Sequence, residues 1–107
     1  MAINHVLAGI PTNNYAAGLS WYENLFGRPP DVIIKEDEAL WQLADHGLVY
    51  LVEDRERAGK ALLTLMVDDV EQYAPADQIE TVPGRFRRAV VSDPDGNRIM
   101  IGQELSR

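Results

Sequence analysis

The stretch that decides the fold lies near the end of the chain and reads Arg88-Ala89-Val90-Val91-Ser92-Asp93-Pro94-Asp95-Gly96-Asn97-Arg98-Ile99-Met100-Ile101. Two short apolar segments are joined here by a five-residue turn. Pro94 presets a turn φ, the two aspartates can bond nearby backbone N–H groups, and Gly96 or Asn97 can take the positive φ that reverses the chain. The stretch therefore predicts a β-hairpin with strands over about 86–91 and 98–103.

The residues before this hairpin predict a strand, a short helix and another strand. Residues 61–67 are apolar and β-capable, and Asp68-Asp69 can cap a short helix through Tyr73. Pro75 cuts this helix short or lets it extend irregularly toward Ile79. A strand at 80–82 then follows, and Pro83-Gly84 separate it from the hairpin. The second half of the chain is therefore expected to run strand, helix, strand, strand, strand.

The first half of the chain predicts the same order. Residues 3–10 form a buried strand, and Asn13 or Asn14 can cap a helix over about 15–26, which Gly27 ends. Two prolines forbid any continuation of this helix. Three further strands are expected over 32–35, 40–44 and 48–53. Two halves of about 50 residues with one plan indicate an internal duplication.

Composition narrows the class of protein. The chain has 107 residues, of which 46% are apolar, as expected for a single compact domain. Its net charge of −7 repels nucleic acid phosphates and anionic lipid heads, so neither nucleic acid nor a membrane is an expected partner. No apolar run is long enough to span a membrane and no signal pattern opens the chain, which favours a cytoplasmic protein. The absence of cysteine excludes disulfides and thiolate chemistry.

Four pieces of the sequence together resemble the vicinal oxygen chelate superfamily, which includes glyoxalase I, extradiol dioxygenases and bleomycin-resistance proteins. They are the opening strand with His5, the helix end from Trp21 to Gly27, the segment from Leu65 to Val70, and the final turn. The resemblance implies an α+β fold of two βαβββ modules, about 1–57 and 58–107, that form a curled, cup-shaped mixed sheet with helices on its outer face. It also implies a homodimer.

The resemblance places four metal-ligand positions in this chain. Matching the motifs puts them at His5, Tyr50 (or, with a one-residue slip, Val49), Leu62 and Met100. Leucine and methionine cannot replace the imidazole and carboxylate ligands that a hard or borderline divalent ion requires. The sequence therefore predicts that the metal is absent and that the protein has no cofactor.

Strand alternation predicts which side chains would line the cup. The expected ligand-binding residues are mostly apolar, with a few polar groups, which is the usual composition of a small-molecule site. They are His5, Leu7, Trp41 (or its neighbour Gln42, depending on the hairpin register), Tyr50, Leu62, Thr64 and Met100. The same residues could instead pack a dry core.

Three functions remain open at this point. The first is a metal-independent protein that binds a small apolar or aromatic molecule, in the manner of the antibiotic-sequestering members of the superfamily. The second is a metal-dependent glyoxalase- or dioxygenase-like enzyme that uses His5. The third is a dimeric domain without a ligand. Whether the protein catalyses a reaction is left open, because its other acidic and basic runs are typical of solvated loops and strand edges.

Overall fold

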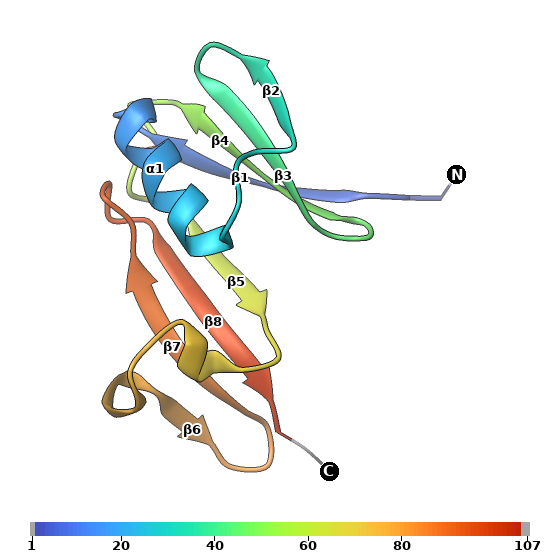
Figure 1. Ribbon diagram of the computed structural model, residues 1–107, viewed down its shortest axis with the longest axis vertical. Helices are drawn as coiled ribbons and strands as arrows, with labels where there is room; N and C mark the ends of the chain where they lie inside the picture. The colour runs from blue at the N-terminus through green and yellow to red at the C-terminus, as the bar shows by residue number, and fades with distance from the viewer. Residues whose placement is uncertain (1, 106–107) are drawn as a thin grey trace. The chain divides into compact units, whose positions relative to one another are not determined.

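The computed structural model describes residues 2–105 and has an α+β fold (Figure 1). The chain divides into two compact units. The first contains the residues up to Ala61 together with Asp93–Asn97, and the second contains Leu62–Ser92 together with the residues from Arg98 onward. Each unit holds one four-stranded mixed sheet, and both sheets are curled and remain open.

The first unit is built from a four-stranded sheet and one helix. Its strands are β1 (Val6–Thr12), β2 (Val32–Lys35), β3 (Glu38–Ala44) and β4 (Gly47–Glu53), in the spatial order β1-β4-β3-β2. Strand β1 runs parallel to β4, and the other pairs are antiparallel. The helix α1 (Tyr15–Phe26) connects β1 to β2 and lies against one face of this sheet.

Local signals at both ends define α1. The Asn14 side chain accepts a hydrogen bond of 3.2 Å from the backbone N–H of Ala17, which satisfies one of the N–H groups that the first turn leaves free. At the other end Gly27 has a φ of 75°, and its N–H donates to the carbonyl of Glu23 at 2.9 Å. Glycine adopts this left-handed conformation without a steric penalty. The helix therefore has the limits that the sequence predicts.

The core of the first unit lies between α1 and the sheet. Trp41 of β3 is fully buried. The centroid of its ring lies 6.4 Å from the ring centroid of Tyr22 and 5.3 Å from that of Phe26, both on α1. The indole N–H of Trp41 donates to the carbonyl of Arg28 at 3.1 Å. The other buried apolar residues of this layer are Ile10, Ala39, Val49 and Leu51. The polar end of the indole is thus paired while its rings supply apolar area.

The second unit repeats the sheet of the first. Its strands are β5 (Leu62–Met66), β6 (Glu80–Val82), β7 (Phe86–Ser92) and β8 (Arg98–Glu104), in the spatial order β5-β8-β7-β6. Strand β5 runs parallel to β8, as β1 does to β4. The buried side chains of this unit are Val70, Ala74, Ala89, Ile99 and Ile101.

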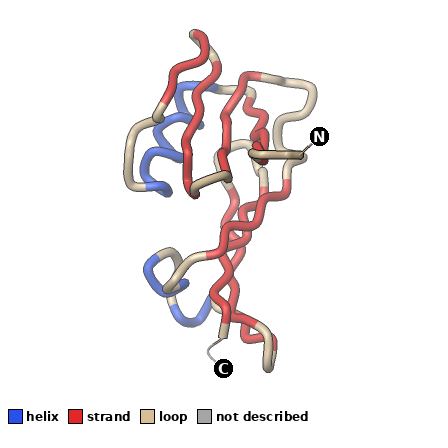
Figure 2. The backbone as a smooth tube through the Cα atoms, turned by 90° about the vertical axis from the view of Figure 1, so that its right-hand side faces the viewer, coloured by secondary structure: helices blue, strands red, loops and turns tan. Residues whose placement is uncertain are grey.

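The helix expected after residue 68 is present only as two short 3-10 turns, η1 (Val70–Gln72) and η2 (Ala76–Gln78). Figure 2 shows both as isolated helical turns in blue. Asp69 does cap η1, because its side chain accepts from the N–H of Glu71 at 3.0 Å. Pro75 lacks an N–H group and disfavours helical backbone at the residue before it, so the turn does not extend. The short helical segment expected from Asp69 through Tyr73, with an irregular extension toward Ile79, is therefore present as these two 3-10 turns.

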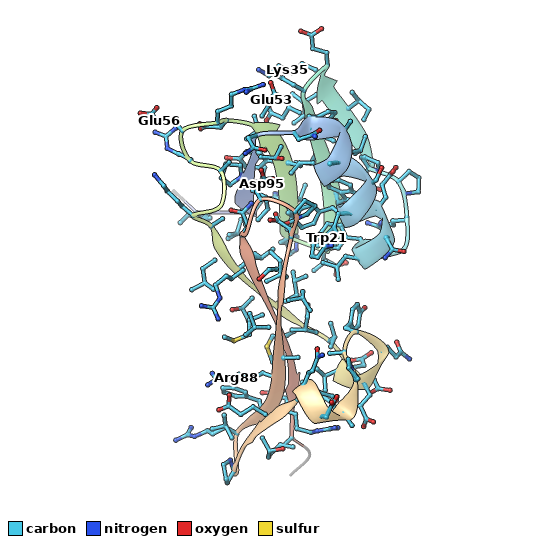
Figure 3. All side chains as sticks on the ribbon, turned by 90° about the vertical axis from the view of Figure 1, so that its left-hand side faces the viewer. Trp21, Lys35, Glu53, Glu56, Arg88 and Asp95 are labelled. Carbon is cyan, nitrogen blue, oxygen red and sulfur yellow. The ribbon has the colours of Figure 1, made fainter. Side chains whose placement is uncertain are left out.

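The five turn residues between β7 and β8 pack with the first unit. Asp95, labelled in Figure 3, accepts a hydrogen bond of 2.5 Å from the hydroxyl of Thr12 and one of 2.9 Å from the N–H of Asn13. Asn97 is fully buried and donates to the carbonyl of Pro11 at 2.8 Å. Its side-chain oxygen accepts from the N–H of Ala61 at 2.9 Å. The turn is therefore hydrogen-bonded both to the end of β1 and to Ala61.

Candidate functional site

The first sheet has one face covered by α1 and one that α1 leaves uncovered. Residues that lie level on neighbouring strands share a face, and the register pairs Leu7 with Leu48, Gly9 with Tyr50, and Leu40 with Tyr50. We call the uncovered side the open face of the first sheet. It carries Leu7, Gly9, Pro11, Val32, Glu38, Leu40, Gln42, Leu48, Tyr50 and Val52.

Tyr50 leans across the neighbouring strand β1. A Cβ atom built on Gly9 would lie only 2.6 Å from both the Cζ and the hydroxyl oxygen of Tyr50. The ring therefore occupies space that is free only because residue 9 has no side chain. Within the part of the chain that the structure describes, no residue hydrogen-bonds to this hydroxyl. Tyr50 thus presents an aromatic ring and a free polar group on the open face.

Trp41 does not belong to this face, which corrects one of the expected site residues. It pairs with Val49 and points with it toward α1, where the indole is fully buried. The neighbouring residue Gln42 pairs with Leu48 and lies on the open face instead. The register shifts between Gln42 and Ala44, so counting back from the turn misplaces the alternation by one residue.

His5 lies just before β1 and is exposed. Its Nδ1 lies 2.9 Å from the side-chain oxygen of Asn4, and its ring meets that of His46 edge to face at a centroid distance of 5.3 Å. His46 lies in the turn between β3 and β4 and is exposed, as expected. Tyr50 is level with Gly9, four residues further along β1, which corresponds to roughly 13 Å of strand. His5 and Tyr50 therefore do not converge on one point of the sheet.

The second sheet also has an uncovered face. The turn η1 packs on the side that carries Ala89 and Ile101, since the N–H of Val70 donates to the side chain of Gln103 at 3.0 Å. The opposite side is the open face of the second sheet. It carries Leu62, Thr64, Met66, Arg88, Val90, Arg98 and Met100. Leu62 is 72% exposed and Met66 is 59% exposed, so this face presents apolar side chains to solvent.

Three of the expected residues, Leu62, Thr64 and Met100, thus share one face of β5 and β8, and Thr64 lies level with Met100. Leu7 and Tyr50 share the open face of the first sheet.

The internal repeat gives an independent position for the ligand residue of β4. Met100 lies level with Thr64, two residues after Leu62 on the neighbouring strand. The residue that has the same relation to His5 is Leu48, which lies level with Leu7. The repeat therefore favours Leu48 over Tyr50 as the counterpart of Met100. Neither side chain of the Leu48 and Met100 pair offers a nitrogen or oxygen ligand.

The side chains at these positions do not fit a divalent metal ion. One imidazole, two leucines and a methionine lack the several nitrogen or oxygen donors that such an ion requires. Within residues 2–105, no three or more histidine, aspartate or glutamate side chains are grouped so as to hold a metal ion. His5 and His46 together supply two imidazoles but no third ligand of this kind.

A buried polar cluster was not anticipated from the sequence, where Asp93 reads as a turn residue only. The hydroxyl of Tyr22 donates to the Asp93 carboxylate at 2.7 Å, and the amide of Asn97 donates to the same oxygen at 2.8 Å. The other carboxylate oxygen accepts from the N–H groups of Asp95 and Asn97, each at 2.9 Å. Burial, the hydrogen bond to Asp93 and the nearby negative charges of Asp93 and Asp95 raise the pKa of the Tyr22 hydroxyl well above its usual range.

This cluster has a structural character, because its donors and acceptors are paired with one another. The sequence signal that could have revealed it is Tyr22 itself, a polar aromatic on the inner face of α1. A buried tyrosine hydroxyl usually has a hydrogen-bond partner.

In the described part of the chain, no helix has the length and apolar character needed to cross a membrane.

Comparisons with known proteins find solved structures that are similar to this chain. No family model and no curated protein matches the sequence. The chain is 35% identical to the glyoxalase / bleomycin resistance protein from Catenulispora acidiphila, with a TM-score of 0.83 over 94% of this chain and 98% of that one.

Two further structures share the fold at lower identity. An antibiotic binding protein from Streptomyces sp. CB03234 is 23% identical, with a TM-score of 0.74 over 98% of this chain and 99% of that one. A bleomycin-binding protein, solved in complex with bleomycin, is 16% identical, with a TM-score of 0.66 over 96% of this chain and 100% of that one.

Proposed function

Because the chain belongs to the glyoxalase/bleomycin resistance family of the vicinal oxygen chelate superfamily, we propose that it binds an apolar or aromatic small molecule without a metal ion. The single observation that carries this proposal is the residue set at the superfamily's metal positions. Leu62 and Met100, and either Tyr50 or Leu48, stand where several imidazole or carboxylate ligands would be required.

The open faces of the two sheets support the choice of ligand. Each face carries leucine, valine or methionine side chains, together with polar groups such as Tyr50, Gln42 and Thr64 and with the charged residues Glu38, Arg88 and Arg98. Apolar walls with a small number of polar groups are typical of small-molecule sites. Methionine adapts to irregular partners, and tyrosine stacks on flat ones. The names of two structural relatives, which bind bleomycin and an antibiotic, point to the same class of ligand.

The proposal also covers the oligomeric state and the cellular location of the protein. We expect a single domain made of both modules, acting as a homodimer in the cytoplasm. Edge strands such as β2, with three exposed apolar residues, favour association with a second copy.

The first test is elemental analysis of protein purified without a chelator. We expect far less than one transition metal ion per chain. Stoichiometric nickel, zinc, iron or manganese, lost in the His5→Ala variant, would instead support a metal-dependent enzyme that uses His5. The contact between His5 and His46 is the feature that such a metal would exploit.

The second test is a thermal-shift screen with uncharged apolar and aromatic compounds. A compound that binds the folded protein raises its melting temperature. Leu62→Glu is expected to abolish the shift of compounds that bind on the open face of the second sheet, because it places a charge there. Leu62 is 72% exposed, so this variant keeps its fold and isolates binding. His5→Ala is expected to weaken binding only modestly. A screen in which no compound stabilises the wild type would contradict the proposed function.

A further inference from the structure

We infer that Gly9 and Tyr50 form a stacking platform on the open face of the first sheet, selective for uncharged planar conjugated molecules that carry a hydrogen-bond acceptor. This inference rests on the proposed small-molecule binding and names the chemistry of the ligand. In it Gly9 is a positioning residue, which acts through the ring of Tyr50.

The first step of the argument is steric. Gly9 and Tyr50 are level on the parallel strands β1 and β4. Three atoms at the far end of the Tyr50 side chain lie within 3.0 Å of the place that a Cβ on residue 9 would occupy. A tyrosine beside any larger residue would have to swing away from β1. The missing side chain therefore lets the ring lie across two strands.

The second step concerns the surroundings of the ring. Leu7, Leu40 and Leu48 lie on the same face, on the three strands around it. Leu7 is 51% exposed, so apolar surface is offered to solvent beside the ring. A ring that lies over the sheet, with aliphatic side chains around it, matches the flat surface of a conjugated molecule. Aromatic pairs gain from offset stacking in addition to the area they bury.

The third step concerns polarity and charge. The Tyr50 hydroxyl has no hydrogen-bond partner in the described part of the chain, so it is available to donate to a ligand oxygen. The residues level with Tyr50 on this face, Gly9 and Leu40, are uncharged, and the charged residue Glu38 lies two positions further along β3, level with Val52. A charged ligand stacked on the ring would lose its hydration without finding an opposite charge on the residues level with the ring. An uncharged molecule with a carbonyl or similar acceptor is therefore the complementary class.

The test compares two uncharged carbonyl compounds, planar acridone and globular, saturated camphor, by fluorescence titration and calorimetry. We expect acridone to bind the wild type more tightly than camphor does. Gly9→Ala should weaken acridone binding about fivefold by displacing the ring, a loss within the range measured for aromatic pairs. It should leave camphor binding unchanged. Its unfolding midpoint should stay near that of the wild type, because only the free end of a side chain has to move.

Gly47→Ala is the matched control. Gly47 lies in the same sheet, and a Cβ there would meet only the Cβ of Ala44, at an ordinary contact distance of 3.5 Å. This variant should bind acridone like the wild type. Tyr50→Leu should lose about as much affinity as Gly9→Ala, and the double variant should lose no more than either, because both changes remove the same platform. Tyr50→Phe keeps the ring and loses only the hydrogen bond, so it should lose less affinity than Tyr50→Leu does, about twofold.

The possible outcomes separate this inference from the proposed function. If Gly9→Ala binds acridone like the wild type, or if its loss adds to that of Tyr50→Leu, the platform is wrong. If camphor binds and acridone does not, the platform is wrong while small-molecule binding stands. If neither probe binds but other compounds stabilise the protein in the thermal-shift screen, the platform is likewise wrong and small-molecule binding stands. If no compound binds in either assay, both proposals fail.

Discussion

Asp93 is the residue on which most of the buried polar contacts converge. Its carboxylate accepts four hydrogen bonds, two from side chains and two from backbone N–H groups, and it is only 6% exposed. A buried donor that loses its acceptor costs more free energy than the bond contributed, because nothing replaces its lost hydration. The stability of the turn therefore depends on this side chain more than on the turn geometry alone.

We expect Asp93→Ala to lower the free energy of unfolding by about 3 kcal/mol, since the Tyr22 hydroxyl, one side-chain N–H of Asn97 and the backbone N–H groups of residues 95 and 97 lose their acceptor. Tyr22→Phe removes one donor and leaves the other bonds of Asp93 intact, so about 1 kcal/mol is expected. Urea unfolding of both variants measures the difference. Equal losses in the two would show that the carboxylate does not organise the cluster.

The raised pKa of Tyr22 predicts a loss of stability in alkali. The folded protein holds the phenolic proton more tightly than the unfolded chain, in which the pKa is near 10.0. Above that pH the unfolded chain releases the proton first, so the free energy of unfolding falls by up to about 1.4 kcal/mol per pH unit. Below pH 10 the contribution of Tyr22 does not change with pH.

Urea unfolding of wild type and Tyr22→Phe between pH 8 and about pH 11 measures this effect. The other tyrosines titrate in both proteins, so the difference between the two slopes isolates Tyr22. Parallel slopes would contradict the expected change.

At the scale of single elements, local signals explain why the sequence predicts α1 and most of the strands. Asn14, Gly27 and the two prolines after it act within a few residues of where they stand, and so do the turn residues 93–97. The second helical segment is predicted in outline, because Asp69 caps its start and Pro75 interrupts it, but neither signal shows that it consists of two separate 3-10 turns.

The face on which Trp41 lies was not predictable for a different reason. The decisive irregularity between Gln42 and Ala44 is a feature of strand pairing, and no residue type in that stretch marks it. The partners of Asp93 and Asp95 were also beyond the sequence, since each pairs with a residue more than 70 positions away. Short-range patterns specify elements, whereas contacts between distant segments depend on the assembled fold.

A prediction at this scale concerns the start of α1. Asn14→Ala should lower the free energy of unfolding by about 1 kcal/mol, because the N–H of Ala17 loses its acceptor. Asn13→Ala is the matched control, since in the described part of the chain only the backbone of Asn13, and not its side chain, makes a hydrogen bond. Thermal unfolding followed by circular dichroism measures both. Equal effects of the two substitutions would exclude a capping role.

At the scale of the whole molecule, the exposed apolar residues favour self-association. Val32, Ile33 and Ile34 on the edge strand β2 are each about half exposed or more. An uncovered apolar edge is a common site of pairing with another chain, and two-fold dimers are the most frequent solution. We therefore expect light scattering at micromolar concentration to give twice the 12.0 kDa of one chain. A monomer under these conditions would contradict this expectation.

The placement of residues 93–97 in the first unit has a consequence for synthesis on the ribosome. Thr12 and Asp95 are 83 positions apart, so the first unit lacks part of its own packing until almost the whole chain has emerged. Until then the hydroxyl of Tyr22 and the N–H of Ala61 have no native acceptor, and the hydroxyl of Thr12 has only the carbonyl of Asn14. The module that is translated first therefore waits for a turn that belongs to the second half of the chain, and the final hairpin supplies the missing piece.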